Sequence, residues 1–209
     1  HPDVHKIVFE LIDELAGACE SDIFHVGMDE VFAIADPKCP RCGGKDPARI
    51  FADEVTRLRE HLAKNNRTLW LWSDRLIDGK ATKIGKWEAS TNGTHGAVDL
   101  IPKDVVACDW HYEKAHATPE FFAEKGLRVL ACPWKDSRVA LDQLKMMQRL
   151  ANSPQGDKAL GMIQTTWVPL DDFMQAYQGK SEKKDAKGSA ECFRTLFAAM
   201  RELKLKNAK

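Results

Sequence analysis

The sequence predicts an α/β fold, and two observations favour a (β/α)-barrel within that class. Short apolar runs alternate along the chain with longer segments whose apolar residues recur at helical spacing. The short runs are apolar throughout, which suits parallel strands covered on both faces. Strands that alternate with helices form parallel sheets with right-handed crossovers, so a doubly wound sheet fits as well. A full barrel needs eight strands and about 250 residues, and the five strands expected here indicate part of one.

The first half of the chain holds two expected helices and two expected strands. Residues 4–16 place five apolar side chains at helical spacing, and residues 23–26 follow as a short buried strand. Asp46-Pro47 is an N-cap with proline at the first helical position, and the helix that it opens ends at the asparagines 65–66. Residues 68–71 are the second strand.

The second half holds three strands and three helices, bounded by similar signals. The expected strands are 105–108, 128–132 and 159–164. The expected helices are 118–126, opened by Thr118-Pro119 and closed by Gly126, then 137–151 and 189–203. Residues 73–103 are expected to be irregular and residues 178–188 to form a charged, solvated loop. No repeat or linker marks a boundary, so a single domain is expected over residues 1–209.

The composition excludes several classes of protein. Lys and Arg number 31 and Asp and Glu number 31, so the formal net charge is zero, whereas nucleic-acid and membrane-surface binders carry a basic excess. No apolar run approaches the roughly 18 residues of a membrane span. Six cysteines in 209 residues are too sparse for a disulfide scaffold. An ordinary globular protein that binds neither nucleic acid nor membrane is expected.

Aromatic residues gather where the predicted strands end. Four of the six tryptophans, Trp72, Trp110, Trp134 and Trp167, lie just past four of the strands. The active site of a parallel α/β fold lies at that end of its strands. Flat indole rings suit the apolar C–H faces of a sugar, so these positions favour a carbohydrate site over simple packing.

Two adjacent carboxylates follow the first strand. Residues 25–30 read His-Val-Gly-Met-Asp-Glu, so that Asp29 and Glu30 stand beside a glycine after a buried run. Acidic pairs are common on solvated helices and mean little there. After a strand, where solvation is limited, the same pair indicates an acid and a stabilising group in a catalytic site.

These residues resemble glycoside hydrolase family 20, the β-N-acetylhexosaminidases. That family carries His-x-Gly-Gly-Asp-Glu after the fourth strand of a (β/α)8 TIM barrel, and Met28 replaces the second glycine here. Residues 71–74, Trp110, residues 134–136 and Trp167 resemble the family's segments at strands five to eight. The resemblance implies an incomplete barrel of about strands 4–8 that forms the C-terminal portion of the catalytic domain.

The resemblance also implies a mechanism and a set of roles. Glu30 would be the general acid, and the substrate's own 2-acetamido oxygen would attack the anomeric carbon, oriented by Asp29. His25 would order the carboxylates, unless it is only a satisfied core histidine. The remaining implied substrate-binding residues are Trp72, Trp110 and Trp167 as pocket walls and Asp136 as a hydroxyl acceptor. No cofactor is implied, and the substrate would be an N-acetyl-hexosaminide.

The sequence departs from the family pattern at two positions. The family's tyrosine that binds the acetamido oxygen is Trp134 here, so that either its indole N–H or Tyr112 would take that role. The family's last glutamate falls at Pro169, so that Asp171 or Asp172 would have to take its place. The substrate-binding arginine of the family's first strand falls outside this chain. A homologue that binds carbohydrate without turnover is therefore an alternative.

Cys39 and Cys42 form a Cys-Pro-Arg-Cys motif just after the acidic pair. A closed zinc site needs four ligands and no second such motif exists, so a loop staple, a local disulfide or free thiols are favoured over a metal site. A metal-stapled interaction module is the third reading of the function.

The start of the chain and its open edges lead to expectations about partners and location. His1 is not preceded by a signal peptide in this sequence, so either a leader was removed or the chain is a piece of a longer protein. A missing N-terminal barrel segment or self-association is expected to cover the edge strands. The family is often exported, whereas the free-looking cysteines favour the cytoplasm.

Overall fold

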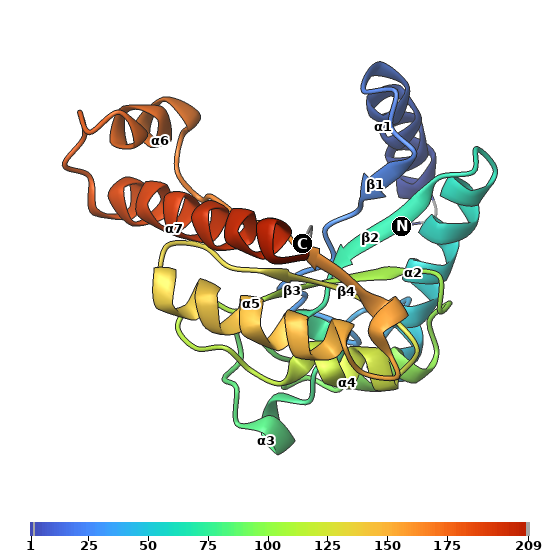
Figure 1. The fold of residues 1–209 in the computed structure, drawn as a ribbon. Helices are drawn as coiled ribbons and strands as arrows, with labels where there is room; N and C mark the ends of the chain where they lie inside the picture. The colour runs from blue at the N-terminus through green and yellow to red at the C-terminus, as the bar shows by residue number, and fades with distance from the viewer. Residues whose placement is uncertain (2, 208–209) are drawn as a thin grey trace. The chain divides into compact units, whose positions relative to one another are not determined.

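A computed structural model describes residue 1 and residues 3–207, and it confirms the α/β class. Five parallel strands follow chain order in one sheet, β1-β2-β3-β4-β5 (Figure 1). The strands are β1 (Ile23–His25), β2 (Thr68–Trp72), β3 (Val106–Trp110), β4 (Arg128–Cys132) and β5 (Ala159–Met162). Helices lie between them, as in a (β/α)-barrel with five of its eight strands present.

The helices are of two kinds, regular α-helices and short 3-10 turns. The α-helices are α1 (Val4–Ala18), α2 (Pro47–Ala63), α3 (Gly79–Thr82), α4 (Thr118–Glu124), α5 (Ser137–Ala151), α6 (Leu170–Tyr177) and α7 (Lys184–Asn207). The 3-10 helices are η1 (Asp74–Leu76), η2 (Thr94–Asp99) and η3 (Gly156–Lys158). The chain divides into two compact units. The first unit comprises His1–Cys108 and Lys125–Arg128, and the second comprises Asp109–Glu124 and the described part of Val129–Lys209.

In the first unit, α2 covers β2 and forms the core with the segment that follows β2. Asp46 caps α2 as predicted, because its side chain accepts the backbone N–H of Ala48 at 3.0 Å. Residues 73–103 are irregular as predicted, yet they are not a solvated loop. Leu76, Ile77 and Ala97 in this segment are buried, and η1 and η2 pack against each other.

The other helix of this unit, α1, buries Ile12 but leaves most of its apolar stripe uncovered. It contacts α2 through its opposite side, where Phe9 stacks on His61 with ring centroids 4.0 Å apart. Ile7 is 66% exposed and Leu11 is 53% exposed, although the sequence pattern placed both on a core-facing stripe. The strand predicted at 23–26 is present as β1, but it is not buried as predicted, since Ile23 is 43% exposed. Among the described residues β1 is an edge strand that pairs with β2 alone, which leaves its other side uncovered.

In the second unit, α5 packs beside β5 and α7 (Figure 1). The predicted bounds of β4 and α5 are confirmed, and the predicted helix at 118–126 is α4. One prediction for this unit is wrong, and one helix was not predicted. Helix α7 begins at Lys184, inside the stretch predicted as a loop. The buried residues of its first turns are small, such as Ala186 and Ala190, so they produce no clear hydrophobic pattern in the sequence. Helix α6, which follows Pro169 and carries two aspartates in its first turn, was not anticipated.

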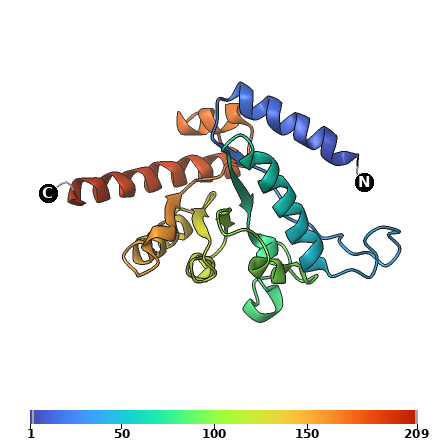
Figure 2. The same ribbon diagram turned by 90° about the vertical axis from the view of Figure 1, so that its right-hand side faces the viewer.

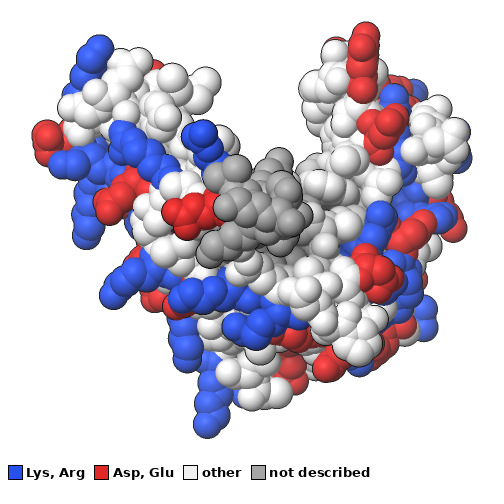
Figure 3. Space-filling view, in the orientation of Figure 1, with Lys and Arg blue, Asp and Glu red and all other residues white. Residues whose placement is uncertain are grey.

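The surface agrees with the neutral composition. Acidic and basic side chains are interspersed over the face drawn in Figure 3 rather than gathered into one patch. Among the described helices, none combines the length and the apolarity needed to cross a bilayer.

We expect residues 1–209, produced alone, to self-associate. An edge strand and an uncovered apolar helix stripe both recruit other chains. Sedimentation or light scattering at tens of micromolar should therefore give species larger than a monomer. The Leu11→Lys variant should reduce the association, whereas the matched Glu10→Lys variant, a charge change at the neighbouring exposed position, should not. A monomer that unfolds cooperatively would contradict this expectation.

Candidate functional site

The acidic pair lies directly after β1, at the carboxyl end of the strand. Pairing with β2 continues past the last residue of β1, because Val26 donates to Trp70 O at 2.9 Å and Trp72 donates to Gly27 O at 2.9 Å. This pairing fixes the chain up to Gly27, two residues before Asp29. Asp29 is half-buried and Glu30 is exposed. The two carboxylates therefore stand at the strand end where parallel α/β folds place their chemistry.

The backbone that presents the pair is in an uncommon conformation. Gly27 has φ 76°, Met28 has φ 74° and Glu30 has φ 50°, all in the left-handed region. Side-chain-bearing residues held there cost about 1–3 kcal/mol each and persist only where the surroundings enforce them. Such strain gathers at functional sites. Met28 occupies the position of the second glycine in the His-x-Gly-Gly-Asp-Glu motif. The chain therefore adopts the positive φ of this turn without glycine, the residue that does so at no steric cost.

A buried ion pair holds the strained segment in place. The backbone N–H of Glu30 donates to Asp74 Oδ2 at 3.0 Å, and Arg75 Nε donates to the same oxygen at 2.6 Å. The guanidinium Nη2 also donates to three backbone carbonyls, those of Lys86, Trp87 and Ala89. Both side chains are almost completely buried. Asp74 therefore positions the backbone of Glu30, and Arg75 holds Asp74.

Asn92 holds the residues just beyond Glu30. Its amide Nδ2 donates to Val31 O at 2.8 Å and to Phe32 O at 3.1 Å. Asp74, Arg75 and Asn92 were not among the functional residues predicted from the sequence. Asp74 and Arg75 come just after β2, and this place after a strand is the signal that could have found them. Asn92 lies sixty-one residues from Val31 and gave no local signal.

His25 and Trp72 come together at the ends of β1 and β2. Their ring centroids are 4.4 Å apart, with the planes inclined by 54°. His25 Nδ1 accepts the backbone N–H of Gly27 at 3.1 Å, which fixes the ring and leaves the proton on Nε2. That Nε2 is buried and has no hydrogen-bond partner among the described residues. His25 is thus oriented by the turn and retains an unused donor, unlike a satisfied core histidine.

Within the second unit, three of the predicted tryptophans form one cluster around Tyr112. Trp110 lies 5.1 Å and Trp134 lies 5.4 Å from the ring centroid of Tyr112. Trp167 Nε1 donates to the Tyr112 hydroxyl at 2.6 Å. Thr165 Oγ1 lies 3.3 Å from the same hydroxyl, and it donates its own proton to the carbonyl of Pro133 at 2.9 Å. The structure therefore brings together Trp110, Tyr112, Trp134 and Trp167 as a single aromatic surface.

Trp134 has an unused hydrogen-bond donor in this cluster. Its Nε1 is buried and has no partner among the described residues. Lys135 Nζ lies 3.9 Å from the centroid of the same ring and pairs with Asp185 at 2.7 Å. A buried indole N–H without a partner is uncommon, because leaving it unpaired costs about 1–3 kcal/mol. This donor is the group that a ligand acceptor would satisfy.

Asp136 serves as the N-cap of α5. Its Oδ1 accepts the backbone N–H of Arg138 at 2.8 Å, and its Oδ2 pairs with the Arg138 guanidinium at 3.1 Å. Arg138 and the capping N–H groups together hold the pKa of Asp136 below its usual value. The carboxylate is therefore ionised, and both of its oxygens accept hydrogen bonds from Arg138. Asp172, one of the two residues considered as a substitute at Pro169, pairs with Lys183 at 2.7 Å.

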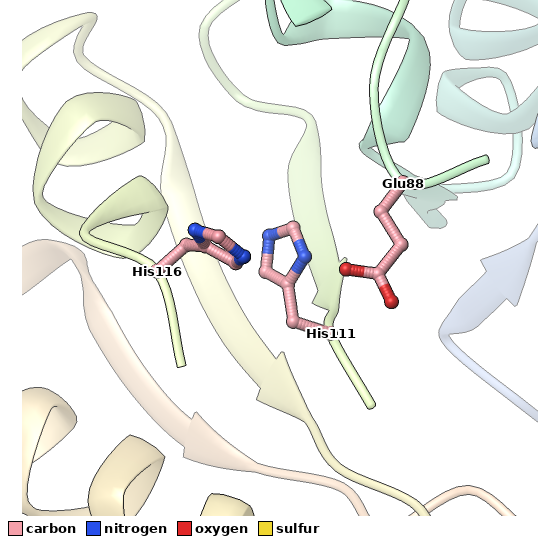
Figure 4. Close-up of side chains that lie close together, drawn as sticks. All are labelled: Glu88, His111 and His116. Atoms are coloured by element: carbon pink, nitrogen blue, oxygen red, sulfur yellow. The ribbon is translucent and has the colours of Figure 1, made fainter. Parts of the chain in front are cut away.

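The residues after β3 also form a buried polar network that the sequence analysis did not anticipate. His111 is almost fully buried, and its Nε2 lies 3.0 Å from Thr118 Oγ1 and 3.3 Å from Asp109 Oδ1. Thr118 in turn donates to Asp109 Oδ2 at 2.6 Å. The ring of His116 meets that of His111 edge-on, with centroids 4.8 Å apart (Figure 4). This network fixes the loop that carries Tyr112.

The arrangement of these side chains on the fold is typical of one class of protein. Parallel strands alternate with helices, carboxylates follow one strand, and tryptophans stand at or after the carboxyl ends of the four others. A glycan-active enzyme of the (β/α)-barrel type has these features.

Comparison with known families agrees. The chain matches the family described as glycosyl hydrolase family 20, catalytic domain, over residues 1–192, and it therefore belongs to that family. A search of curated proteins finds no match. The family assignment makes the chain a (β/α)-barrel-type glycoside hydrolase domain for carbohydrate substrates of the hexosamine type. The predictions of fold and family are confirmed. The individual site residues stay predictions.

Proposed function

We propose that this chain carries the catalytic groups of a β-N-acetylhexosaminidase that cleaves terminal N-acetyl-hexosamine residues with retention of configuration. The observation that carries the proposal is the placement of Asp29 and Glu30. They follow β1 on a strained turn whose backbone is held by the buried Asp74–Arg75 pair. Because the strained turn costs stability and such strain clusters at functional sites, the two carboxylates that it presents are expected to take part in the reaction.

In the proposed mechanism the enzyme supplies an acid and the substrate supplies the nucleophile. Glu30 gives its proton to the leaving glycosidic oxygen. The oxygen of the substrate's acetamido group attacks the anomeric carbon from the opposite face, so that the leaving group departs and a cyclic oxazolinium ion forms. Asp29 orients the acetamido N–H and stabilises the positive charge. Water then opens the ring, and Glu30 takes up the proton of that water.

The remaining predicted residues are proposed to bind the sugar. Trp72, Trp110 and Trp167 would form apolar walls, and Asp136 would accept a hydroxyl. The unused Nε1–H of Trp134 supports a role in donating to the acetamido oxygen, in place of the tyrosine that the family uses there. His25, which also retains a buried donor at Nε2, would donate to the substrate or to a carboxylate.

The first test is hydrolysis of a chromogenic N-acetyl-β-glucosaminide. The assay should use a protein with a complete catalytic domain, in which this chain is accompanied by the other β/α units of an eight-stranded barrel. Release of the chromophore at ordinary enzyme rates supports the proposal. Binding of N-acetyl-glucosamine without any release would instead favour a carbohydrate-binding homologue. The presence of Pro169 at the position of the family's last glutamate is the observation that favours this second function.

Asp29→Asn is expected to weaken binding of a thiazoline analogue of the cyclised intermediate by roughly 10- to 100-fold. The estimate follows from losing one hydrogen bond to a charged group, worth about 1.5–3 kcal/mol. Calorimetry on wild type and variant measures the change. Asp22→Asn, an exposed aspartate just before β1, is the matched control and should bind the analogue as wild type does. Equal affinity for wild type and Asp29→Asn would remove Asp29 from the proposed role.

A further inference from the structure

Two cysteines share one turn of the loop that joins β1 to α2. This loop projects beside the start of α2 (Figure 2). Cys39 and Cys42 are both free thiols and both half-buried. The backbone N–H of Cys42 points at Cys39 Sγ, with the nitrogen and sulfur 3.3 Å apart. The thiols are therefore neighbours in the folded protein, in a segment to which the proposed hydrolysis assigns no role.

Backbone hydrogen bonds keep this turn in one conformation. Cys39 N donates to Asp36 O at 2.8 Å, and Gly43 N donates to Cys39 O at 3.0 Å, as in one turn of helix. A Cβ at Gly43 would lie 2.7 Å from Cys39 O and 2.8 Å from Pro37 O. Only glycine fits there, so the residue after the motif allows the turn to close. The turn thereby keeps the backbone N–H of Cys42 at the sulfur of Cys39.

The environment of the two thiols is unequal. Hydrogen bonds from the Cys42 thiol and from the backbone N–H groups of Cys42 and Arg41 lower the pKa of Cys39 to about 7. The same thiol–thiol hydrogen bond raises the pKa of Cys42, because Cys42 keeps its proton to donate it. Cys39 is thus the member of the pair that ionises more readily near neutral pH, and Cys42 is the neighbour that keeps its proton.

The other four cysteines lack this arrangement. Cys108, Cys132 and Cys192 are buried. Desolvation raises the pKa of Cys192 to about 11, which keeps it protonated and unreactive. Cys19 is exposed at the end of α1 and has no second thiol in its helix turn. Cys19 therefore provides an internal reference for an ordinary accessible thiol.

We propose that Cys39 and Cys42 form a redox-active dithiol that is oxidised to an intramolecular disulfide by low-molecular-weight disulfides such as oxidised glutathione. The Cys39 thiolate attacks one sulfur of the small disulfide, forms a mixed disulfide and releases one small thiolate, which takes up a proton. Cys42 then loses its proton and attacks the Cys39 sulfur, which releases the second small thiol. The dithiol loses two electrons and two protons, and the small disulfide gains both.

Access and ligand number both favour a dithiol over a metal site. Cys39 is only half-buried, so a small disulfide can reach its sulfur from solvent. Cys42 lines a cavity of about 760 Å³ together with Met28, Val31 and Ile34. A structural zinc ion needs four ligands. Among the described residues, no third cysteine, histidine or carboxylate lies within ligand distance of the two sulfurs. The motif therefore offers two thiols and not a four-ligand zinc site.

The test is the reaction of the full protein with oxidised glutathione, followed by alkylation of remaining thiols and peptide mass spectrometry. At pH 7 we expect Cys39 to react about three- to fourfold faster than Cys19. With a pKa of about 7, Cys39 is about half ionised at that pH, and the lower nucleophilicity of the more acidic thiol offsets part of the gain from the larger thiolate fraction. The product peptide should contain a Cys39–Cys42 disulfide. In the Cys42→Ser variant Cys39 should remain as the mixed disulfide, because no resolving thiol is present.

Three outcomes would overturn the proposal. The first is a Cys39 that reacts no faster than Cys19 and with the same dependence on pH. The second is a wild-type protein that accumulates glutathione on Cys39 without forming the intramolecular disulfide. The third is a stoichiometric zinc ion in the purified protein that blocks alkylation of both cysteines until a chelator removes it. None of these readouts depends on glycoside hydrolysis, so they leave the proposed function untouched.

Discussion

Replacing Glu30 with glutamine is expected to lower turnover of natural N-acetyl-hexosaminides by about 10²- to 10⁴-fold, the usual contribution of a general acid. Glutamine has the size of glutamate but has no proton to give to the leaving oxygen. The backbone N–H that anchors this residue to Asp74 is unchanged, and the side chain is exposed. The fold should therefore remain intact, and the loss should appear in kcat rather than in stability.

The choice of leaving group separates an acid from a residue that only binds. A good leaving group such as a dinitrophenolate needs little protonation, so the Glu30→Gln variant should hydrolyse such a substrate with a much smaller loss. Glu14→Gln, which changes an exposed glutamate on α1, is the matched control and should leave both rates unchanged. Equal and small losses for the two substrates would reject Glu30 as the acid.

The second large effect is expected at Arg75. The Arg75→Met variant leaves the buried Asp74 carboxylate without its closest cation and leaves three carbonyls without the Nη2 donor. Removing one partner of a buried ion pair costs about 3–5 kcal/mol. We expect a loss of that size in the free energy of unfolding, measured in urea. Catalysis should fall as well, because Asp74 holds the backbone of Glu30.

Arg59→Met provides the matched control for this prediction. Arg59 and Asp104 also form a bidentate ion pair in the first unit, but both side chains are partly exposed. Exposed pairs contribute about 0–1 kcal/mol, so this variant should unfold almost as wild type does. If the two variants lose the same small amount, Arg75 does not hold the site in the way argued here.

The sequence analysis succeeded where signals are local. Strand β4 lies between Gly126 and Pro133, and α5 has both an aspartate cap and an apolar stripe, so their bounds were predictable. It failed where the outcome depends on distant neighbours. Whether the apolar stripe of α1 is buried depends on what packs against it, and nothing within residues 4–16 indicates that. The small residues that bury the start of α7 give almost no hydrophobic pattern.

The same distinction applies to the site. Residues at strand ends, such as Glu30 and Tyr112, were found because parallel strands place their chemistry there. The hydrogen bond that holds the backbone of Glu30 was not predicted, because its acceptor, Asp74, lies 44 residues away in the sequence. The central role of Tyr112, to which Trp167 donates from 55 residues away, likewise emerges only from the folded chain.

The most direct test of the central claim is the response of the rate to fluorine in the substrate's acetamido group. If that group is the nucleophile, its oxygen must attack the anomeric carbon, and electron-withdrawing fluorine atoms weaken the attack. We predict that kcat/KM for chromogenic N-acetyl-β-glucosaminides falls steeply from the acetyl to the difluoroacetyl to the trifluoroacetyl derivative. The corresponding β-glucoside, which lacks the amide, should not be hydrolysed. A flat series, or hydrolysis of the glucoside at a similar rate, would contradict the account.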